Sequence, residues 1–208
     1  MQINTTNQIN YSARNPKIRF ADDIARKVNQ EFPRISPSKM ETFANSDNFV
    51  EGMEDLWLKV KKMRHNITFK TINKKDFKKI DILFKTIKKK QIGNCGESAD
   101  LALAIAKMNG IENCTKAGIK SPYGRSFDHA VVLVNDKKPY VIDAWLGFAD
   151  YVPNTIKKYQ TIYRNCFDFK ENGERMIVEP YASHIVNNYL SQSSISKLLE
   201  AYPHMKIK

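Results

Sequence analysis

Apolar residues in the first ninety positions recur at intervals of three and four, which is the period of an amphipathic helix. The pattern predicts a short helix over residues 20–32 and a second helix that begins around residues 36–38 and runs towards Arg64. A third helix is predicted from about residue 74 to residue 89. Residues 1–19 show no such period, so we expect a loosely structured segment there. The front of the chain is therefore predicted to be helical.

The pattern changes after residue 90. A helix that is apolar almost all round is predicted from Cys95 to about Asn109, because Gly110 is a typical C-terminal stop. Three or four strand-like runs follow, and a helical tail is predicted near residues 185–201. A helix without a polar face belongs in the centre of a domain, so we expect this one to be buried against the strands.

This order of elements predicts one α+β domain over residues 1–208. It consists of a helical, basic N-terminal lobe over residues 1–90 and, over residues 91–208, a core in which a central buried helix packs on an antiparallel sheet before a helical C-terminal tail. No repeat or glycine–serine linker divides the chain. With 42% hydrophobic and 27% charged residues, 208 residues suffice for one sizeable core.

The charge is concentrated in one stretch. Lys and Arg number 34 against 22 Asp and Glu, a formal net charge of +12, and residues 59–90 hold 13 basic residues against only Asp76 and Asp81. This stretch therefore carries +11 of the +12. Its apolar positions follow helical spacing and predict a core-facing stripe beneath a basic outer face: Phe69, Ile72, Phe77, Ile80, Leu83, Phe84 and Ile87.

A basic face of this kind is either a solvated surface or a docking surface for an acidic protein or a membrane. Nucleic acid is disfavoured, because the interleaved aromatic residues fit a core stripe better than a stacking platform and no nucleic-acid motif is present. The lysines expected to meet an acidic docking surface on a protein substrate are Lys74, Lys75, Lys78, Lys79, Lys88, Lys89 and Lys90.

Other whole-chain features narrow the class of protein. The longest apolar runs fall far short of the roughly 20 residues needed to cross a bilayer, so no membrane span is expected. The polar, amide-rich N-terminus does not resemble a secretory signal peptide. Three widely spaced cysteines are typical of reduced thiols, not of a disulfide scaffold. We therefore expect a soluble protein of a reducing compartment, and no cofactor.

Cys95 lies at the start of the predicted apolar helix. Asn94 is a favourable N-cap, and Glu97 three residues later completes the pattern of a capping box. In the first helical turn, unpaired N–H groups and the helix dipole favour a thiolate. Taken alone, Cys95 also fits an inert buried cysteine. The residues near it in space must therefore distinguish a reactive thiol from a structural one.

His129 and Asp143 lie on two predicted strands joined by a short polar turn. If the turn consists of residues 135–137, Asp143 lies directly opposite His129, with Cβ atoms about 4.5 to 5.5 Å apart. A carboxylate at that distance accepts a hydrogen bond from an imidazole N–H. Pro139 can shift this register, but any shift by an even number of residues leaves both side chains on one face of the sheet.

A thiol at a helix start, an imidazole on one strand and a carboxylate on the next are the groups that thiol catalysis needs. The carboxylate fixes the imidazole tautomer and stabilises the imidazolium that forms when the thiol gives up its proton. The sequence therefore predicts a catalytic triad of Cys95, His129 and Asp143.

The segments around the triad resemble the core of the transglutaminase-like and papain-like thiol superfamily over about residues 91–147. They read Gly-Asn-Cys95-Gly-Glu at the start of an alanine-rich helix, then Asp-His129-Ala-Val-Val-Leu-Val, then Tyr-Val-Ile-Asp143-Ala-Trp. The spacings of 34 and 14 residues are similar to those of bacterial toxin and effector glutamine deamidases. The resemblance implies a papain/transglutaminase-like core, a thioester intermediate, and a virulence effector that reaches a host cytosol without a cleaved signal.

Three further residues are candidates for oxyanion or substrate contacts: Gln91, Asn94 and Trp145. By analogy with papain-type enzymes, the Gln91 amide is a candidate second oxyanion donor beside the Cys95 N–H. Trp145 follows Asp143 by two residues, so it lies on the same face and is placed to shield the His–Asp pair from water. The remaining cysteines and histidines lack ligand spacing, so no metal site is expected.

The triad alone does not choose among three reactions. Hydrolysis of a glutamine side-chain amide, hydrolysis of a peptide bond and transfer of the acyl group to an amine share the same apparatus. We favour deamidation of a protein glutamine, with a cysteine protease and a transglutaminase as alternatives. The alternative to an enzyme is a non-enzymatic binding module whose basic face docks an acidic partner.

Overall fold

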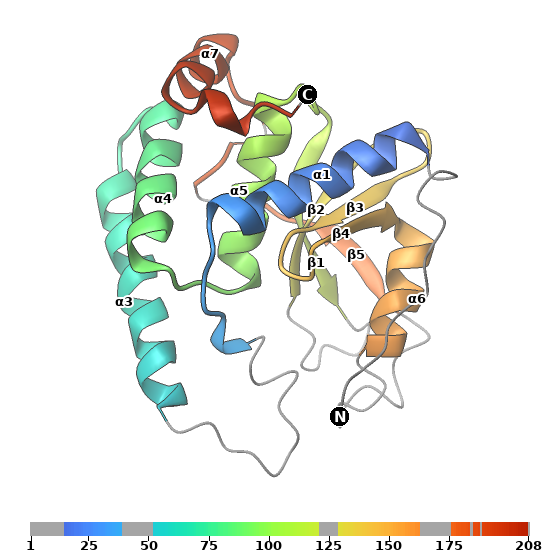
Figure 1. Cartoon of the computed structure of the whole chain (residues 1–208), viewed down its shortest axis with the longest axis horizontal. Helices are drawn as coiled ribbons and strands as arrows, with labels where there is room; N and C mark the ends of the chain where they lie inside the picture. Colours follow the sequence, from blue (N-terminus) through green and yellow to red (C-terminus); the bar gives the residue numbers. More distant parts are fainter. Residues whose placement is uncertain are drawn as a thin grey trace.

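The computed structural model describes most of the chain, namely residues 15–38, 52–120, 129–162, 176–183, 185–187 and 189–207. These residues form an α+β fold with an antiparallel sheet, as predicted (Figure 1). The described residues include six α-helices, and the sheet has five strands where three or four were expected. The helices are α1 (Pro16–Glu31), α3 (Met53–Thr71), α4 (Asp76–Lys90), α5 (Cys95–Met108), α6 (Val152–Ile162) and α7 (Gln192–Ala201). The strands are β1 (Cys114–Lys120), β2 (His129–Val134), β3 (Tyr140–Asp143), β4 (Phe148–Tyr151) and β5 (Ile177–Pro180).

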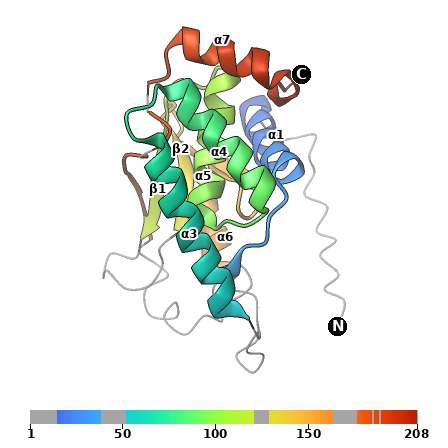
Figure 2. The same cartoon turned by 90° about the vertical axis from the view of Figure 1, so that its left-hand side faces the viewer.

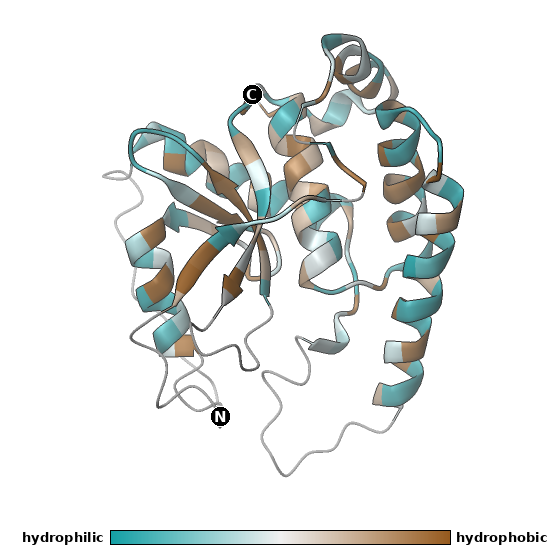
Figure 3. Ribbon diagram, turned by 180° about the vertical axis from the view of Figure 1, so that it is seen from behind, coloured by the Kyte–Doolittle hydropathy of each residue, from teal (hydrophilic) through white to brown (hydrophobic). Residues whose placement is uncertain are grey.

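The sheet has the order β4-β3-β2-β1-β5, and every neighbouring pair is antiparallel. Side chains alternate between its two faces. Val132 and Ile142 belong to the core cluster shared with α1 and α5, whereas Val131, Val141 and Tyr159 of α6 belong to a second cluster. The sheet is therefore covered on both faces, and Figure 3 shows hydrophobic residues along several of its strands.

Helix α5 occupies the centre of the fold. Every residue from Glu97 to Met108 is buried, and only its first two residues are partly exposed. The alternating alanines permit close approach to the sheet on one side and to neighbouring helices on the others. Gly110 has φ +84, a left-handed conformation that ends the helix where the sequence predicts. The expected central buried helix on an antiparallel sheet is confirmed.

The start of α1 differs from the prediction. The helix begins at Pro16, not at residue 20, because the Asn15 side chain accepts a hydrogen bond from the Lys17 N–H at 2.9 Å and proline suits the first helical position. Residues 1–14 lie outside the described part of the chain. Helix α1 packs on α5 and on β3 and β4, so it shares the core of the sheet.

Residues 37 and 38 are helical, where the predicted second helix starts, but Arg64 lies on a separate helix. It begins at Met53 after Gly52, and residues 39–51 lie outside the described residues. Helices α3 and α4 run side by side in front of α5 in Figure 2. Helix α7 starts at Gln192, seven positions after the predicted tail begins, and it packs on α4 and α5.

The apolar stripe across α3 and α4 is only partly as predicted. Helix α4 buries the four expected residues Ile80, Leu83, Phe84 and Ile87. Phe69 and Ile72, however, are 71% and 55% exposed. The buried stripe of α3 runs through Ile67 and Thr71, and Phe69 falls between them on the opposite side of the helix. The prediction that Phe69 and Ile72 face the core is wrong.

The β2–β3 hairpin has a different register from the predicted one. Val134 pairs with Tyr140, so the turn has five residues instead of three. Pro139 explains the shift, because it has no N–H to donate to the ladder and the strand begins after it. Asp143 is therefore diagonal to His129, not directly opposite it. Because the shift is even, both side chains remain on the face that packs against α6.

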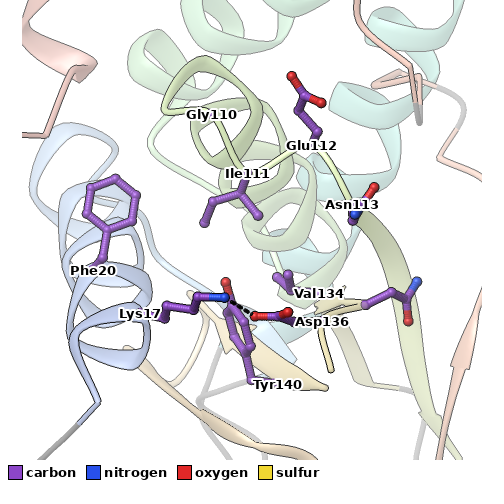
Figure 4. Close-up of a pocket in the computed structure, with 10 residues that line it drawn as sticks. Lys17, Phe20, Gly110, Ile111, Glu112, Asn113, Val134, Asp136 and Tyr140 are labelled. Carbon is purple, nitrogen blue, oxygen red and sulfur yellow. Dashed lines mark hydrogen bonds and ion pairs between the residues drawn. The ribbon is translucent and has the colours of Figure 1, made fainter. Parts of the chain in front are cut away.

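The far end of the hairpin is tied to α1. Figure 4 shows a hollow between α1, the C-terminal end of α5 and the hairpin turn, where Lys17 Nζ lies 2.5 Å from Asp136 Oδ2. This hollow lies at the opposite end of α5 from Cys95. Within the described residues, no helix has both the length and the hydrophobicity needed to span a membrane.

Candidate active site

The N-terminus of α5 is held by a network of buried polar groups. Asn94 and Glu97 form a capping box, in which the Asn94 N–H donates to Glu97 Oε2 at 2.8 Å. The Arg64 guanidinium of α3 donates to both Glu97 oxygens, at 2.6 and 2.9 Å. Burial by itself raises the pKa of Glu97, but these contacts with Arg64 outweigh it and lower that pKa. Glu97 is therefore a helix cap, as predicted, and it fixes the backbone next to Cys95.

Asp143 accepts hydrogen bonds on both carboxylate oxygens. Oδ2 lies 2.7 Å from His129 Nε2 and also accepts the Tyr159 hydroxyl. Oδ1 accepts the backbone N–H groups of Trp145 and Leu146, each at 2.9 Å. Burial by itself raises the pKa of Asp143, but the charge of His129 and the hydrogen bonds from His129 and Tyr159 lower it overall. An ionised carboxylate with four donors therefore lies behind the imidazole.

The His129 ring connects Asp143 to Cys95. Its Nε2–H donates to Asp143, and the ring makes a further side-chain hydrogen bond with Cys95, which leaves Nδ1 to face the thiol. Burial by itself lowers the pKa of His129, but the charge and hydrogen bond of Asp143 and the contact with Cys95 raise it to about 10. The structure thus brings together the three residues of the predicted triad, with an imidazolium favoured beside the thiol at neutral pH.

Trp145 covers the imidazole. Its ring centroid lies 4.8 Å from that of His129, and the indole Nε1–H donates to Ser36 Oγ at 2.8 Å. The Ser36 hydroxyl in turn donates to Asn94 Oδ1 at 3.0 Å. Trp145 and Asn94, two sequence-predicted site residues, are therefore linked through Ser36, and Asn94 acts as a structural link here.

The segment that carries Ser36 lies beside the connection between α4 and α5. Ile35 and Ile92 form a parallel bridge, in which the Ile35 N–H donates to the Gln91 carbonyl at 2.8 Å and the Gly93 N–H donates to the Ile35 carbonyl at 3.0 Å. A Cβ at Gly93 would lie 3.2 Å from the Glu97 Cβ, so a larger residue here would push against the capping side chain. Residues 34–38 thereby fix the position of the backbone segment that leads into Cys95.

Gln91 is not brought to the triad. It is the C-cap of α4 in a left-handed conformation with φ 51, and its side chain is exposed. Within the described residues no hydrogen bond connects this side chain to Cys95, His129 or Asp143. The geometry therefore gives no support to Gln91 as the second oxyanion donor. The Cys95 N–H in the first turn of α5 remains a candidate first donor.

Several other residues considered from the sequence lie away from the triad. The Cys114 thiol is buried on β1 and donates to the Ile111 carbonyl at 2.9 Å, and burial raises the pKa of Cys114 to about 11. His65 is exposed on α3, and His204 Nε2 lies 3.4 Å from Glu31 Oε2. Among the described residues no group of three His, Cys, Asp or Glu side chains is arranged to hold a metal ion. Cys166, His184 and the residues 121–128 that precede the His129 strand lie outside the described part of the chain.

Nothing in the sequence marks two residues of the site, Tyr159 and Ser36, as members of it. Tyr159 is fully buried on α6, and its ring lies 5.5 Å from that of His129 in an edge-on arrangement. Ser36 is a serine beside a proline, which predicts a helix cap. Only the helical period of α6, which places Tyr159 on its apolar face, indicates that this residue meets the sheet.

Comparison of the chain with models of protein families, with curated proteins and with solved structures finds no match in any of the three. The function must therefore be inferred from the chemistry of the site. A thiol, an imidazole and an ionised carboxylate in sequential contact form a set that generates a nucleophile and moves a proton to a leaving group.

The stability of the protein is expected to fall at alkaline pH through His129. A group whose pKa is raised on folding stabilises the folded state fully below its ordinary value, here 6.5, and this contribution is lost as the pH rises towards about 10. Urea midpoints at about pH 6 and about pH 10 test this. The fall of the urea midpoint between these two pH values should be smaller in His129→Gln than in the wild-type protein. An equal fall in both proteins would contradict the expected role of His129.

Tyr159→Phe is expected to lower the reactivity of the Cys95 thiol about tenfold and the free energy of unfolding by about 1 kcal/mol, because one hydrogen bond to Asp143 is removed without a cavity. Tyr140→Phe is the matched control, since Tyr140 is also buried but lies at the far end of β3. A merely structural role would leave the pH profile of Cys95 alkylation unchanged. A shift of that profile in Tyr159→Phe alone supports positioning of the carboxylate.

Proposed function

We propose that this chain is a thiol-dependent hydrolase that acts on amides, with Cys95 as nucleophile, His129 as acid and base, and Asp143 as the residue that orients the imidazole. The observation that supports the proposal most directly is the contact chain from Asp143 Oδ2 to His129 and from His129 to the Cys95 side chain. Further contacts fix the positions of two members. Asp143 accepts hydrogen bonds from four donors, and Cys95 lies at the capped start of α5.

The proposed reaction has two halves. In the first, the Cys95 thiolate forms a bond to the amide carbon, the C–N bond breaks, and His129 gives its Nδ1 proton to the departing nitrogen. In the second, His129 takes a proton from water, the resulting hydroxide attacks the thioester carbon, and the C–S bond breaks to release the acid and regenerate the thiolate. The Cys95 N–H is the proposed donor to the oxyanion in both halves.

As substrate we propose a glutamine side chain of a host protein, so that the nitrogen leaves as ammonia and the product is glutamate. This choice rests on the likeness of the Cys95, His129 and Asp143 segments to those of effector deamidases. Proteolysis and transamidation use the same first half and differ in the amide attacked or in the final acceptor.

The basic residues near the site are proposed to bind an acidic surface of that substrate. Lys88, Lys89 and Lys90 are exposed in the last turn of α4, and Lys90 precedes the nucleophile Cys95 by five residues. Lys74, Lys75, Lys78 and Lys79 lie just before or within the first turn of the same 15-residue helix, about 14 to 24 Å along its axis from residues 88–90, so the two groups do not form one compact patch. The substrate-docking role is therefore limited here to the lysines at residues 88–90.

The proposal is tested by peptide mass spectrometry of acidic candidate proteins incubated with wild type and with Cys95→Ala. Conversion of a glutamine to glutamate only with wild type supports deamidation. Cleavage fragments would indicate a protease, and amine adducts would indicate a transglutaminase. If Cys95 reacts with alkylating reagents no faster than the buried Cys114, the thiol chemistry is wrong and a binding module is the better account.

A further inference from the structure

The turn between α3 and α4 exposes apolar and basic side chains together. Phe69 in the last turn of α3 is 71% exposed, and Ile72 at its C-cap is 55% exposed. Lys70, Lys74 and Lys75, which flank them in sequence, are all exposed. Large apolar side chains next to lysines are the combination by which peripheral segments bind a membrane surface. We call residues 69–75 the basic tip.

A hollow of about 520 Å³ adjoins the basic tip, between the start of α4 and the start of α7. Its lining consists of four lysines, three serines, Asn73 and Phe77, and no acidic residue is among these lining residues. The lysines and serines are Lys74, Lys75, Lys78, Lys197, Ser191, Ser193 and Ser194. Ammonium groups and hydroxyls are the groups that bind phosphate oxygens.

Asp76 and Asp81, the two carboxylates of α4, are engaged by other residues. Asp76 accepts the Asn187 side-chain amide at 2.7 Å. Asp81 is buried and paired with Lys78 and Lys85, at 3.0 and 2.8 Å. Lys74, Lys75 and Lys197 face the hollow without an acidic residue in its lining, so their charge is available to an anionic partner.

The basic tip and the candidate active site lie at opposite ends of the molecule. Helix α4 leads directly into α5, so the start of α4 is beside the end of α5, about 20 Å from Cys95. Figures 1 and 2 both show the α3–α4 turn next to α7 at the end of the molecule where α5 finishes. A partner on the basic tip would therefore leave the Cys95 end accessible.

We propose that the basic tip is a docking site for the surface of an anionic phospholipid bilayer. Phe69 and Ile72 enter the boundary between headgroups and acyl chains, while the lysines contact lipid phosphates and the hollow beside α7 receives one headgroup. The pairing of apolar and cationic groups favours a bilayer over an acidic protein, because only the bilayer offers an apolar layer directly beneath its anionic surface. This docking is independent of the thiol chemistry.

The test is co-sedimentation of the full chain with vesicles of phosphatidylcholine alone or mixed with phosphatidylserine. Binding is expected only to the mixed vesicles and is expected to weaken with salt. The double variant Lys74→Gln and Lys75→Gln should bind about 25-fold more weakly, about fivefold for each charge. The matched control, Lys88→Gln with Lys89→Gln, removes the same charge at the other end of α4 and should bind as wild type does.

A second pair of variants tests the apolar part. Phe69→Ser should weaken binding about tenfold, whereas Leu58→Ser, which changes a 47% exposed residue near the start of α3, should not. Equal losses in the two lysine pairs, or equal binding to neutral and anionic vesicles, would overturn the proposal. Retention on immobilised polyglutamate without vesicle binding would also overturn it and would favour an acidic protein. Cys95→Ala should bind vesicles normally, so failure here is distinguishable from failure of the proposed hydrolase.

Discussion

Cys95→Ala is expected to lower amide turnover by about 10⁴-fold or more, to the level of the uncatalysed reaction in the same assay. Alanine removes the sulfur that forms the thioester. Within the described part of the chain, the other side chains that contact His129 carry no thiol: Asp143, Trp145 and Tyr159. The change is small in volume and lies at the partly exposed start of α5, where the capping-box hydrogen bond and the Arg64–Glu97 ion pair join groups other than the thiol. The fold should therefore persist.

Cys114→Ala is the matched control for this prediction. It removes a thiol that is 4% exposed and hydrogen-bonded to a backbone carbonyl, so turnover should stay at the wild-type level while the protein loses some stability. Steady-state turnover and urea unfolding of both variants separate the two effects. Wild-type turnover in Cys95→Ala would show that the triad is not the catalytic group.

Asp143→Asn is expected to lower kcat/KM by about 10⁴-fold, an effect of the size known for the loss of the triad carboxylate in other enzymes. The asparagine oxygen can keep the two backbone N–H bonds of Trp145 and Leu146. Its amide group then faces His129 Nε2 as a donor, so the neutral imidazole must carry its proton on Nδ1, the side of the thiol. An imidazole in that tautomer cannot accept the proton of Cys95.

Asp150→Asn on the neighbouring strand is the matched control, because Asp150 pairs with Lys158 at 2.8 Å and has no contact with His129. It should retain wild-type kcat/KM. In Asp143→Asn the alkylation of Cys95 should also become slow at mildly acidic pH, where an unassisted thiol is protonated. Wild-type kinetics and an unchanged alkylation profile in Asp143→Asn would exclude the orienting role.

Much of the fold follows from local patterns in the sequence. The heptad-like spacing of α4, the apolar composition of α5 and the stop at Gly110 each indicate the element that the structure contains. The face shared by His129 and Asp143 also follows locally, because strand parity survives the even shift that Pro139 causes. These features depend on residues close together in the chain, where the periods of helix and strand constrain the side chains directly.

Other features depend on contacts between residues far apart in the chain. Tyr159 reaches Asp143 only because α6 folds back over the sheet, and Ser36 reaches Asn94 and Trp145 only because residues 34–38 lie beside the start of α5. The exposure of Phe69 likewise follows from the face of α3 that packs on α4. Thus the sequence determined which residues carry the candidate chemistry, whereas the tertiary structure decided what supports them. The physical reason is that local periodicity specifies the face of an element but not its neighbour across the core.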